Sequence, residues 1–343
     1  MASIHRGLSS ATRGLCWIAV MTSATILSVV ASGAAQAPGT APAKVVRTGV
    51  RLPGVVRPMN QLKPLTIFKL EGVPDWSVVT KNAVWVSSSR INRVTQLLPA
   101  TSKAGLLVQV PLPCSGLAYG WGSVWVPSCG SHKLVRIDET TGKATAEIAA
   151  DPASSEGGIA IGDGSVWLVA KPSRLLRVDP QTNSVIKTID LPSGSENPTF
   201  GGGFVWVSAS ARGALLKISP KTNQIMATIP VRPGPRFLTV GAGSVWTLNQ
   251  GDGSVSRVDM SSGKVVATIA LGVPGEGGEI TYGAGSVWAT MFGFPLTQVD
   301  PKTNRPMRQW AGDGGDGVRF GLRSVWLSNG RQGTVWRISP DQP

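Results

Sequence analysis

The sequence predicts an all-β protein, a seven-bladed β-propeller of four-stranded blades. The first observation is a repeated Val-Trp strand, whose tryptophans follow one another at intervals of 40, 42, 39, 40, 42 and 38 residues. Units near 40 residues with several short strands are typical of propeller blades. The second is the abundance of Gly (42) and Pro (25), which suits many strands joined by turns. The third is the lack of a 3.6-residue apolar period, which argues against a helical solenoid.

Each unit resolves into four strands, named A to D in chain order. Five units carry Gly-x-Gly before the Trp strand, where glycine permits the positive φ of a tight A-to-B hairpin. The C-to-D turn of the third unit is Asp179-Pro180-Gln181-Thr182-Asn183, and two later units repeat its pattern. Asp bonds back to the backbone, Pro fixes φ, and Asn tolerates the left-handed position. Turn chemistry and strand pattern therefore agree.

The repeat tryptophans are expected to fill the wedge between adjacent sheets rather than to form a stacking surface. They are preceded by Val in every unit. Among residues 38–343, four others fall outside the repeat position and are free to contribute to a surface: Trp76, Trp121, Trp310 and Trp336.

The seventh unit ends at Pro343 without a strand D. Residues 65–70 read like the strand D of other units, so we expect the N-terminal strand to close the ring by pairing with residues 335–338. The propeller would then span 64–343. Residues 38–63 would lie outside the ring as a flexible basic arm, because they are rich in Pro and Gly and carry five Lys or Arg.

Residues 1–37 read as a signal peptide. Arg6 and Arg13 give a positive start, an apolar stretch follows, and Ala35-Gln36-Ala37 resembles a cleavage site. The alternative of a membrane anchor is weaker, because Thr22, Ser23 and Thr25 interrupt a stretch that is short for a bilayer. We therefore expect a periplasmic or secreted monomer with no membrane span after cleavage.

Cleavage would leave two cysteines, Cys114 and Cys129. An even pair in an oxidising compartment predicts a disulfide. If the A-to-B hairpin turns at residues 120–122, the two cysteines stand directly opposite each other, at a separation that a disulfide can bridge. The alternative is a pair of buried free thiols.

The charge balance is basic, with 33 Lys and Arg against 19 Asp and Glu. Such an excess suits an anionic polymer as partner, although simple solubility explains it equally and no compact basic run stands out.

The Gly-x-Gly-Ser-Val-Trp units resemble the YncE-like and streptogramin (virginiamycin B) lyase-like propeller repeats over residues 64–340. The resemblance implies the propeller fold. In the lyases, the family chemistry relies on histidines and acidic groups with Mg²⁺ at the propeller mouth, where a base removes a proton and a cation stabilises the enolate. Here none of the seven positions ten residues before a repeat Trp is His, and His132 is the single histidine after the leader. The lyase chemistry therefore does not carry over directly.

The D-to-A and B-to-C loops should open on one rim around the channel, where propeller ligands usually bind. Our candidate ligand-binding residues on this rim are Asp75, His132, Glu196, Asn197, Arg236, Asn249, Asn329 and Arg331. Carboxylates gather in the D-to-A loops, and such oxygens suit Mg²⁺ or Ca²⁺. The candidate metal ligands are Glu156, Glu196, Glu276, Glu279 and Asp316. The alternative is a solvated polar rim.

Three functions remain open. The leading hypothesis is a binding or scaffold module that meets a small molecule or a protein at the rim. The second is a metal-assisted lyase or lactone hydrolase that uses the carboxylates at the channel mouth. The third is binding of polyanions through the basic surface and arm, which would weaken steeply with salt. No Ser-His-Asp spacing, zinc motif, P-loop or dinucleotide fingerprint is present.

Overall fold

The computed structural model describes residues 47–153 and 158–342. The proposed signal peptide, residues 1–37, lies outside the described residues. Among those that are described, no helix is long and apolar enough to cross a membrane.

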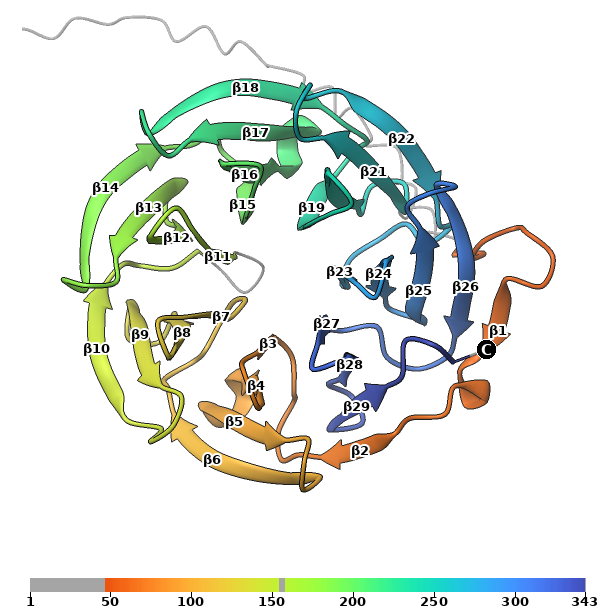
Figure 1. Cartoon of the computed structure of the whole chain (residues 1–343), viewed down its shortest axis with the longest axis horizontal. Coiled ribbons are helices and arrows are strands. Elements are labelled where there is room, and N and C mark those ends of the chain that lie inside the picture. The colour runs from red at the N-terminus through yellow and green to blue at the C-terminus, as the bar shows by residue number, and fades with distance from the viewer. Residues whose placement is uncertain (1–46, 154–157, 343) are drawn as a thin grey trace, which may run out of the picture. The chain divides into compact units, whose positions relative to one another are not determined.

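Seven antiparallel sheets surround a common centre in the unit that contains residues 47–342, which confirms the predicted seven-bladed propeller (Figure 1). Strand A lies innermost in each blade and strand D outermost. In order from A to D, the blades are β3 (Ser77–Val79), β4 (Val84–Ser88), β5 (Arg93–Leu98) and β6 (Lys103–Gln109); β7 (Ala118–Gly120), β8 (Ser123–Ser128), β9 (Lys133–Asp138) and β10 (Ala144–Ala149); β11 (Ile159–Gly162), β12 (Ser165–Ala170), β13 (Arg174–Asp179) and β14 (Ser184–Asp190); β15 (Ser195–Gly201), β16 (Phe204–Ala209), β17 (Ala214–Ser219) and β18 (Gln224–Pro230); β19 (Pro235–Gly241), β20 (Ser244–Asn249), β21 (Ser254–Asp259) and β22 (Val265–Ala270); β23 (Glu279–Gly283), β24 (Ser286–Met291), β25 (Phe294–Asp300) and β26 (Arg305–Ala311); and β27 (Val318–Gly321), β28 (Ser324–Asn329), β29 (Thr334–Ile338) and β2 (Thr66–Lys69).

The ring closes as predicted. Strand β2 pairs antiparallel with β29, with Phe68 opposite Val335. The N-terminal strand therefore supplies the outer strand of blade seven. Because Phe68 is buried in one cluster with Trp326 and Val84, this strand also joins blade seven to the core of blade one.

The segment before β2 differs in part from the expected flexible arm. Residues 38–46 lie outside the described residues, but residues 47–63 are held against the outer edge of blade six. Strand β1 (Val56–Pro58) pairs in parallel with β26, and the backbone N–H of Val50 donates to Gln309 at 2.7 Å. Leu62, just after the short 3₁₀ helix η1 (Met59–Gln61), is 3% exposed. Residues 47–63 are therefore held in place by burial of apolar side chains and by backbone hydrogen bonds to blade six. Two other 3₁₀ turns, η2 (Ser89–Ile91) and η3 (Ser210–Arg212), lie in B-to-C loops.

The repeat tryptophans form the core, as predicted: the seven side chains are 0–2% exposed. Of the four other tryptophans named above, Trp76 and Trp310 are also buried, Trp336 is partly buried, and Trp121 is 44% exposed.

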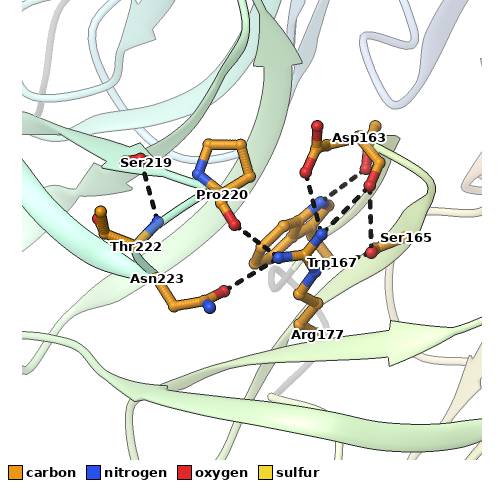
Figure 2. Close-up of polar contacts among 9 residues, drawn as sticks. Asp163, Ser165, Trp167, Arg177, Ser219, Pro220, Thr222 and Asn223 are labelled. Carbon is orange, nitrogen blue, oxygen red and sulfur yellow. Dashed lines mark hydrogen bonds and ion pairs between the residues drawn. The ribbon is translucent and has the colours of Figure 1, made fainter.

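Neighbouring blades are joined by a cation that lies over the repeat tryptophan. In blade three, the Arg177 guanidinium lies 4.9 Å from the centre of the Trp167 ring (Figure 2). Its Nη1 donates to the backbone carbonyl of Pro220 at 2.6 Å and to the Asn223 side chain at 3.2 Å, both in the C-to-D turn of blade four. Its Nε donates to Ser165 at 2.8 Å. One side chain therefore connects two blades by stacking and by charge-assisted hydrogen bonds.

The same connection recurs around the ring. Arg136, Arg257 and Arg337 stack on their own blade's tryptophan and donate to a proline carbonyl in the next blade's C-to-D turn. In blade four, Lys217 lies over the rings of Phe204 and Trp206 and donates to Met260 in blade five. The C-to-D turn, which the sequence predicted as a local chain reversal, therefore also accepts hydrogen bonds from the preceding blade.

The disulfide between Cys114 and Cys129 is present, with Cα atoms 5.7 Å apart, which confirms the predicted pairing. Its geometry differs from the prediction. Ala118 pairs with Trp125 as expected, but Pro113 pairs with Ser128, so the register shifts by two residues before the cysteines are reached. The extra residues lie at positions 114–117. The cysteines are thus diagonal neighbours, and the bond closes a loop of 15 residues, for which chain entropy suggests about 3 kcal/mol.

We expect the change Arg177→Met to lower the free energy of unfolding by about 2 kcal/mol, because it removes charge-assisted bonds between two blades and leaves a buried turn carbonyl without its donor. The free energy of unfolding of Arg177→Lys should lie between those of the unchanged protein and Arg177→Met, since a lysine fills the equivalent place in blade four. Urea unfolding measures the effect. The control is Arg174→Met on the same strand, where the arginine is half exposed and lies 3.9 Å from Asp190. Equal losses for both methionine variants would contradict the connection.

Candidate functional site

The D-to-A and B-to-C loops share one rim. Ser328, in strand β28 just before a B-to-C loop, donates through its hydroxyl to the backbone carbonyl of Asp75 at 2.7 Å. Ser210 likewise donates to the carbonyl of Pro235 at 2.6 Å, from the B-to-C loop of blade four to the entry of β19. These two bonds couple blade seven to blade one and blade four to blade five at this rim.

A cavity of about 300 Å³ lies at the centre of the ring, where the inner strands converge. Its wall comes from consecutive residues of five inner strands, with single residues from blades one and seven. The residues used below are Trp76, Gly116, Ala118, Gly158, Ala160, Asn197, Thr199, Phe237, Thr239, Glu279, Thr281 and Arg319.

One level of this wall is defined by the sheet register. In every blade, one inner-strand residue pairs directly with the repeat tryptophan, so the seven residues are equivalent by position. In blades one to three they are Val78, Ala118 and Ala160. In blades four to seven they are Thr199, Thr239, Thr281 and Arg319. The same repeat position is therefore small and apolar on one side of the ring and polar on the other.

The polar side ends in an ion pair between two blades. The Arg319 guanidinium contacts the carboxylate of Glu279, which is 2% exposed. The second oxygen of Glu279 accepts the backbone N–H of Val318 at 2.8 Å. Arg319 also donates to the Val318 carbonyl at 3.0 Å. Because the carboxylate is buried, it needs both partners, and together they fix the guanidinium at the cavity wall.

Two aromatic side chains from opposite parts of the ring meet at the cavity. The Trp76 ring of blade one lies 5.6 Å from the Phe237 ring of blade five, centre to centre. Both side chains are at least 95% buried. The indole N–H of Trp76 has no hydrogen-bond partner among the described residues. A buried donor of this kind is costly unless a water or a ligand accepts from it.

A second ion pair lies on the rim one residue away from the cavity. Glu196 precedes Asn197, and Arg236 precedes Phe237. The Glu196 carboxylate lies 2.9 Å from Nε of Arg236 and accepts from the Ser210 hydroxyl at 3.3 Å. Burial raises the pKa of the Glu196 carboxyl, and the Arg236 charge and the Ser210 bond oppose this only partly.

Asp316 occupies a separate place, beside a small cavity of about 120 Å³ that Asp75 and Trp76 also line. Its carboxylate accepts the backbone N–H of Gly330 at 3.1 Å. Burial raises the pKa of the Asp316 carboxyl, with the Gly330 bond as the main opposing influence.

Several predicted ligand-binding residues lie elsewhere. Asn249 is fully buried and donates to Ser254 and Ser256 within its own blade. Asn329 borders another cavity, near η1. His132 and Arg331 are exposed and pair with Asp151 and Asp313. The prediction selected these residues because they are polar and lie in or near the rim loops. Their exact position in each loop decides which side chains reach the central cavity.

The predicted metal ligands are not brought together in the described part of the chain. Glu279 and Glu196 each pair with an arginine, Asp316 binds a backbone N–H, and Glu276 is exposed. Glu156 lies outside the described residues. Within residues 47–153 and 158–342, no group of three or more His, Cys, Asp or Glu could hold a metal ion.

Comparison with known proteins gives a likeness of fold. No family model matches the chain, and no curated protein matches it. Among solved structures, a streptogramin B lyase matches with a TM-score of 0.67 at 17% sequence identity, covering 80% of this chain and 96% of the lyase chain. This chain therefore shares the streptogramin lyase-like propeller fold, as the repeat motif implied.

We expect the Tm of Asp316→Asn, relative to that of the unchanged protein, to be higher at pH 7 than at pH 4. Because burial raises the pKa of the Asp316 carboxyl in the folded state, its contribution to stability is complete below the ordinary pKa of Asp and is lost as pH rises through the folded-state pKa. Asparagine avoids this loss and still offers an oxygen to Gly330. Thermal unfolding of both proteins at pH 4 and pH 7 measures the difference. A Tm difference that does not change with pH would contradict the assignment.

Proposed function

We propose that this protein is a binding module outside the cytoplasm, and that its ligand occupies the central cavity next to the rim of D-to-A and B-to-C loops. The observation that carries this proposal is the one-sided wall. Of the seven positions that are equivalent in the repeat, six line the cavity, with three threonines and an arginine on one side and two alanines on the other. Packing of the blades does not require this difference, because each of the seven positions pairs with the same tryptophan.

The size and position of the cavity fit the proposal. Ligand pockets commonly measure about 300–1,000 Å³, so a cavity of about 300 Å³ suits a small molecule. The two ion pairs fix their side chains before a ligand arrives, which lowers the ordering cost of binding. The disulfide and the leader-like residues 1–37 favour an oxidising compartment for this activity.

Filling the cavity tests the proposal. Ala160 lines the cavity and is 9% exposed, so Ala160→Leu should abolish binding of fragments detected by saturation-transfer NMR with a library of mixed charge and polarity. The control is Ala149→Leu, at an exposed place on outer strand β10, which should leave binding unchanged. Circular dichroism confirms that each variant is folded. Fragments that bind equally to both variants would place the ligand elsewhere and contradict the proposal.

A metal-assisted lyase or lactone hydrolase is the second candidate. The shared fold with a streptogramin B lyase favours it, as do two rim carboxyls whose pKa values are raised by burial, Glu196 and Asp316. A carboxylate with a raised pKa is a better general base than an ordinary one.

For this candidate we expect one equivalent of Mg²⁺ or Ca²⁺ by calorimetric titration, and ring opening of a macrocyclic or simple lactone that Glu196→Gln slows at least tenfold. Glu276→Gln, at an exposed rim position, is the control. Absence of both the titration and the turnover would leave the binding module as the function.

A further inference from the structure

The polar side of the cavity wall offers hydroxyl groups that none of the described residues uses. Thr199, Thr239 and Thr281 come from blades four, five and six at one level of the ring. Their hydroxyls make no hydrogen bond with any described residue, although Thr281 is 8% exposed. A threonine hydroxyl can donate one bond and accept two. Three of them in adjacent blades match a ligand whose groups also both donate and accept, which hydroxyls do.

Arg319 occupies the same level in blade seven, next to the three threonines, and reaches across the cavity. Its Nη2 lies 4.0 Å from the place of a Cβ atom on Gly116, in blade two, and has no hydrogen-bond partner among the described residues. This nitrogen therefore reaches across the cavity to the wall of blade two. Nη2 can only donate, so the ligand should present an oxygen acceptor to it.

The charge around the cavity argues against an anion. Glu279 contacts Arg319, so the arginine brings no net positive charge to the wall. On the adjacent rim, Glu196 is matched by Arg236, and the carboxyl of Asp316 lies in the small cavity that Trp76 also lines. An anionic ligand would meet these carboxylates in a setting that screens them poorly. A neutral ligand with oxygen acceptors avoids that repulsion.

The opposite wall is apolar and partly aromatic. Ala118 and Ala160 are small, and Trp76 and Phe237 close the same cavity. A sugar ring has the matching character, with hydroxyls around its edge and C–H groups on its faces. The indole N–H of Trp76, which has no hydrogen-bond partner within residues 47–153 and 158–342, supplies one more donor for a hydroxyl oxygen.

We propose that the central cavity binds a neutral, polyhydroxylated molecule of monosaccharide size, with its hydroxyls against Thr199, Thr239 and Thr281 and an oxygen acceptor at Arg319. This proposal rests on the proposed function, because it names the ligand class of the same cavity. A volume of about 300 Å³ accommodates one sugar ring rather than a long oligosaccharide.

The test uses ring-sized probes that differ in charge and polarity. Glucose, galactose and mannose are the neutral sugars, glucuronate and glucosamine carry a charge on the same ring, and cyclohexanol keeps the ring size with a single hydroxyl. Saturation-transfer NMR with the full mature chain detects binding, and calorimetry gives the affinity of the best probe. We expect at least one neutral sugar to bind more tightly than either charged sugar or cyclohexanol.

The matched variants are Thr239→Val and Thr268→Val. Valine keeps the shape of threonine and removes the hydroxyl, and Thr268 is exposed on outer strand β22, away from the cavity. Thr239→Val should weaken sugar binding roughly three- to tenfold, the worth of one hydrogen bond, and Thr268→Val should not change it. Equal affinity in both variants would overturn the proposed contacts.

Failure of this inference is distinguishable from failure of the proposed function. Tighter binding of glucuronate, glucosamine or cyclohexanol that Ala160→Leu abolishes would overturn the neutral sugar and retain the cavity as the ligand site. The same holds if no probe binds while other fragments bind and are lost in Ala160→Leu. If fragments bind but are insensitive to Ala160→Leu, both proposals are overturned.

Discussion

The structure depends on a cation that lies over the tryptophan of one blade and donates to the outer turn of the next. Arg177 shows the full arrangement, since its guanidinium stacks on Trp167 and bonds to Pro220 and Asn223 (Figure 2). In a ring of repeats, each blade contacts mainly its neighbours, so stability is set at the seams between blades. These contacts fix the angle between blades and thereby the width of the central channel.

Two blades lack this cation. In blade one Gln96 takes its place and still donates to the backbone carbonyl of Glu139 in blade two. The N-terminal segment lies beside the other seam, after blade six. Blade six carries Gln298 at the equivalent place, and its amide donates to Ser286 within the same blade. Here β1 extends the sheet of blade six, and Leu62 packs in one cluster with Trp288 and the core of blade seven. The segment that precedes the closing strand therefore adds apolar contact where the repeated polar connection is missing.

The features that follow from the repeat, namely the fold and the ring closure, were predicted from the sequence. A residue of the cavity wall that differs from blade to blade was not. Seven aligned tryptophans predicted the fold, and the missing last strand predicted closure by residues 65–70, because both follow from periodic pattern. The cysteine pairing was correct although two extra residues shift the register before Cys114. Loop charge gave Glu196, Arg236 and Glu279 as rim candidates, but it did not give Arg319, which lies farther along its unit, next to the A-to-B hairpin of blade seven. Only the contact with Glu279 in the structure identifies Arg319 as part of the cavity wall.

The way the inner strands fit together explains why the cavity wall is free to vary. The glycine that ends β19, Gly241, has no room for a side chain, because Tyr282 of the next blade would lie 2.0 Å from its Cβ. Gly162 and Phe200, and Gly283 and Phe320, meet in the same way. The aromatic residue of each contact follows the tryptophan-paired position of its inner strand, and the glycine lies two residues after that position. Since alternate strand residues point to opposite faces, the aromatic set is constrained by packing against these glycines, while six members of the tryptophan-paired set line the cavity. Side chains at that second set can therefore differ between blades without disturbing the ring.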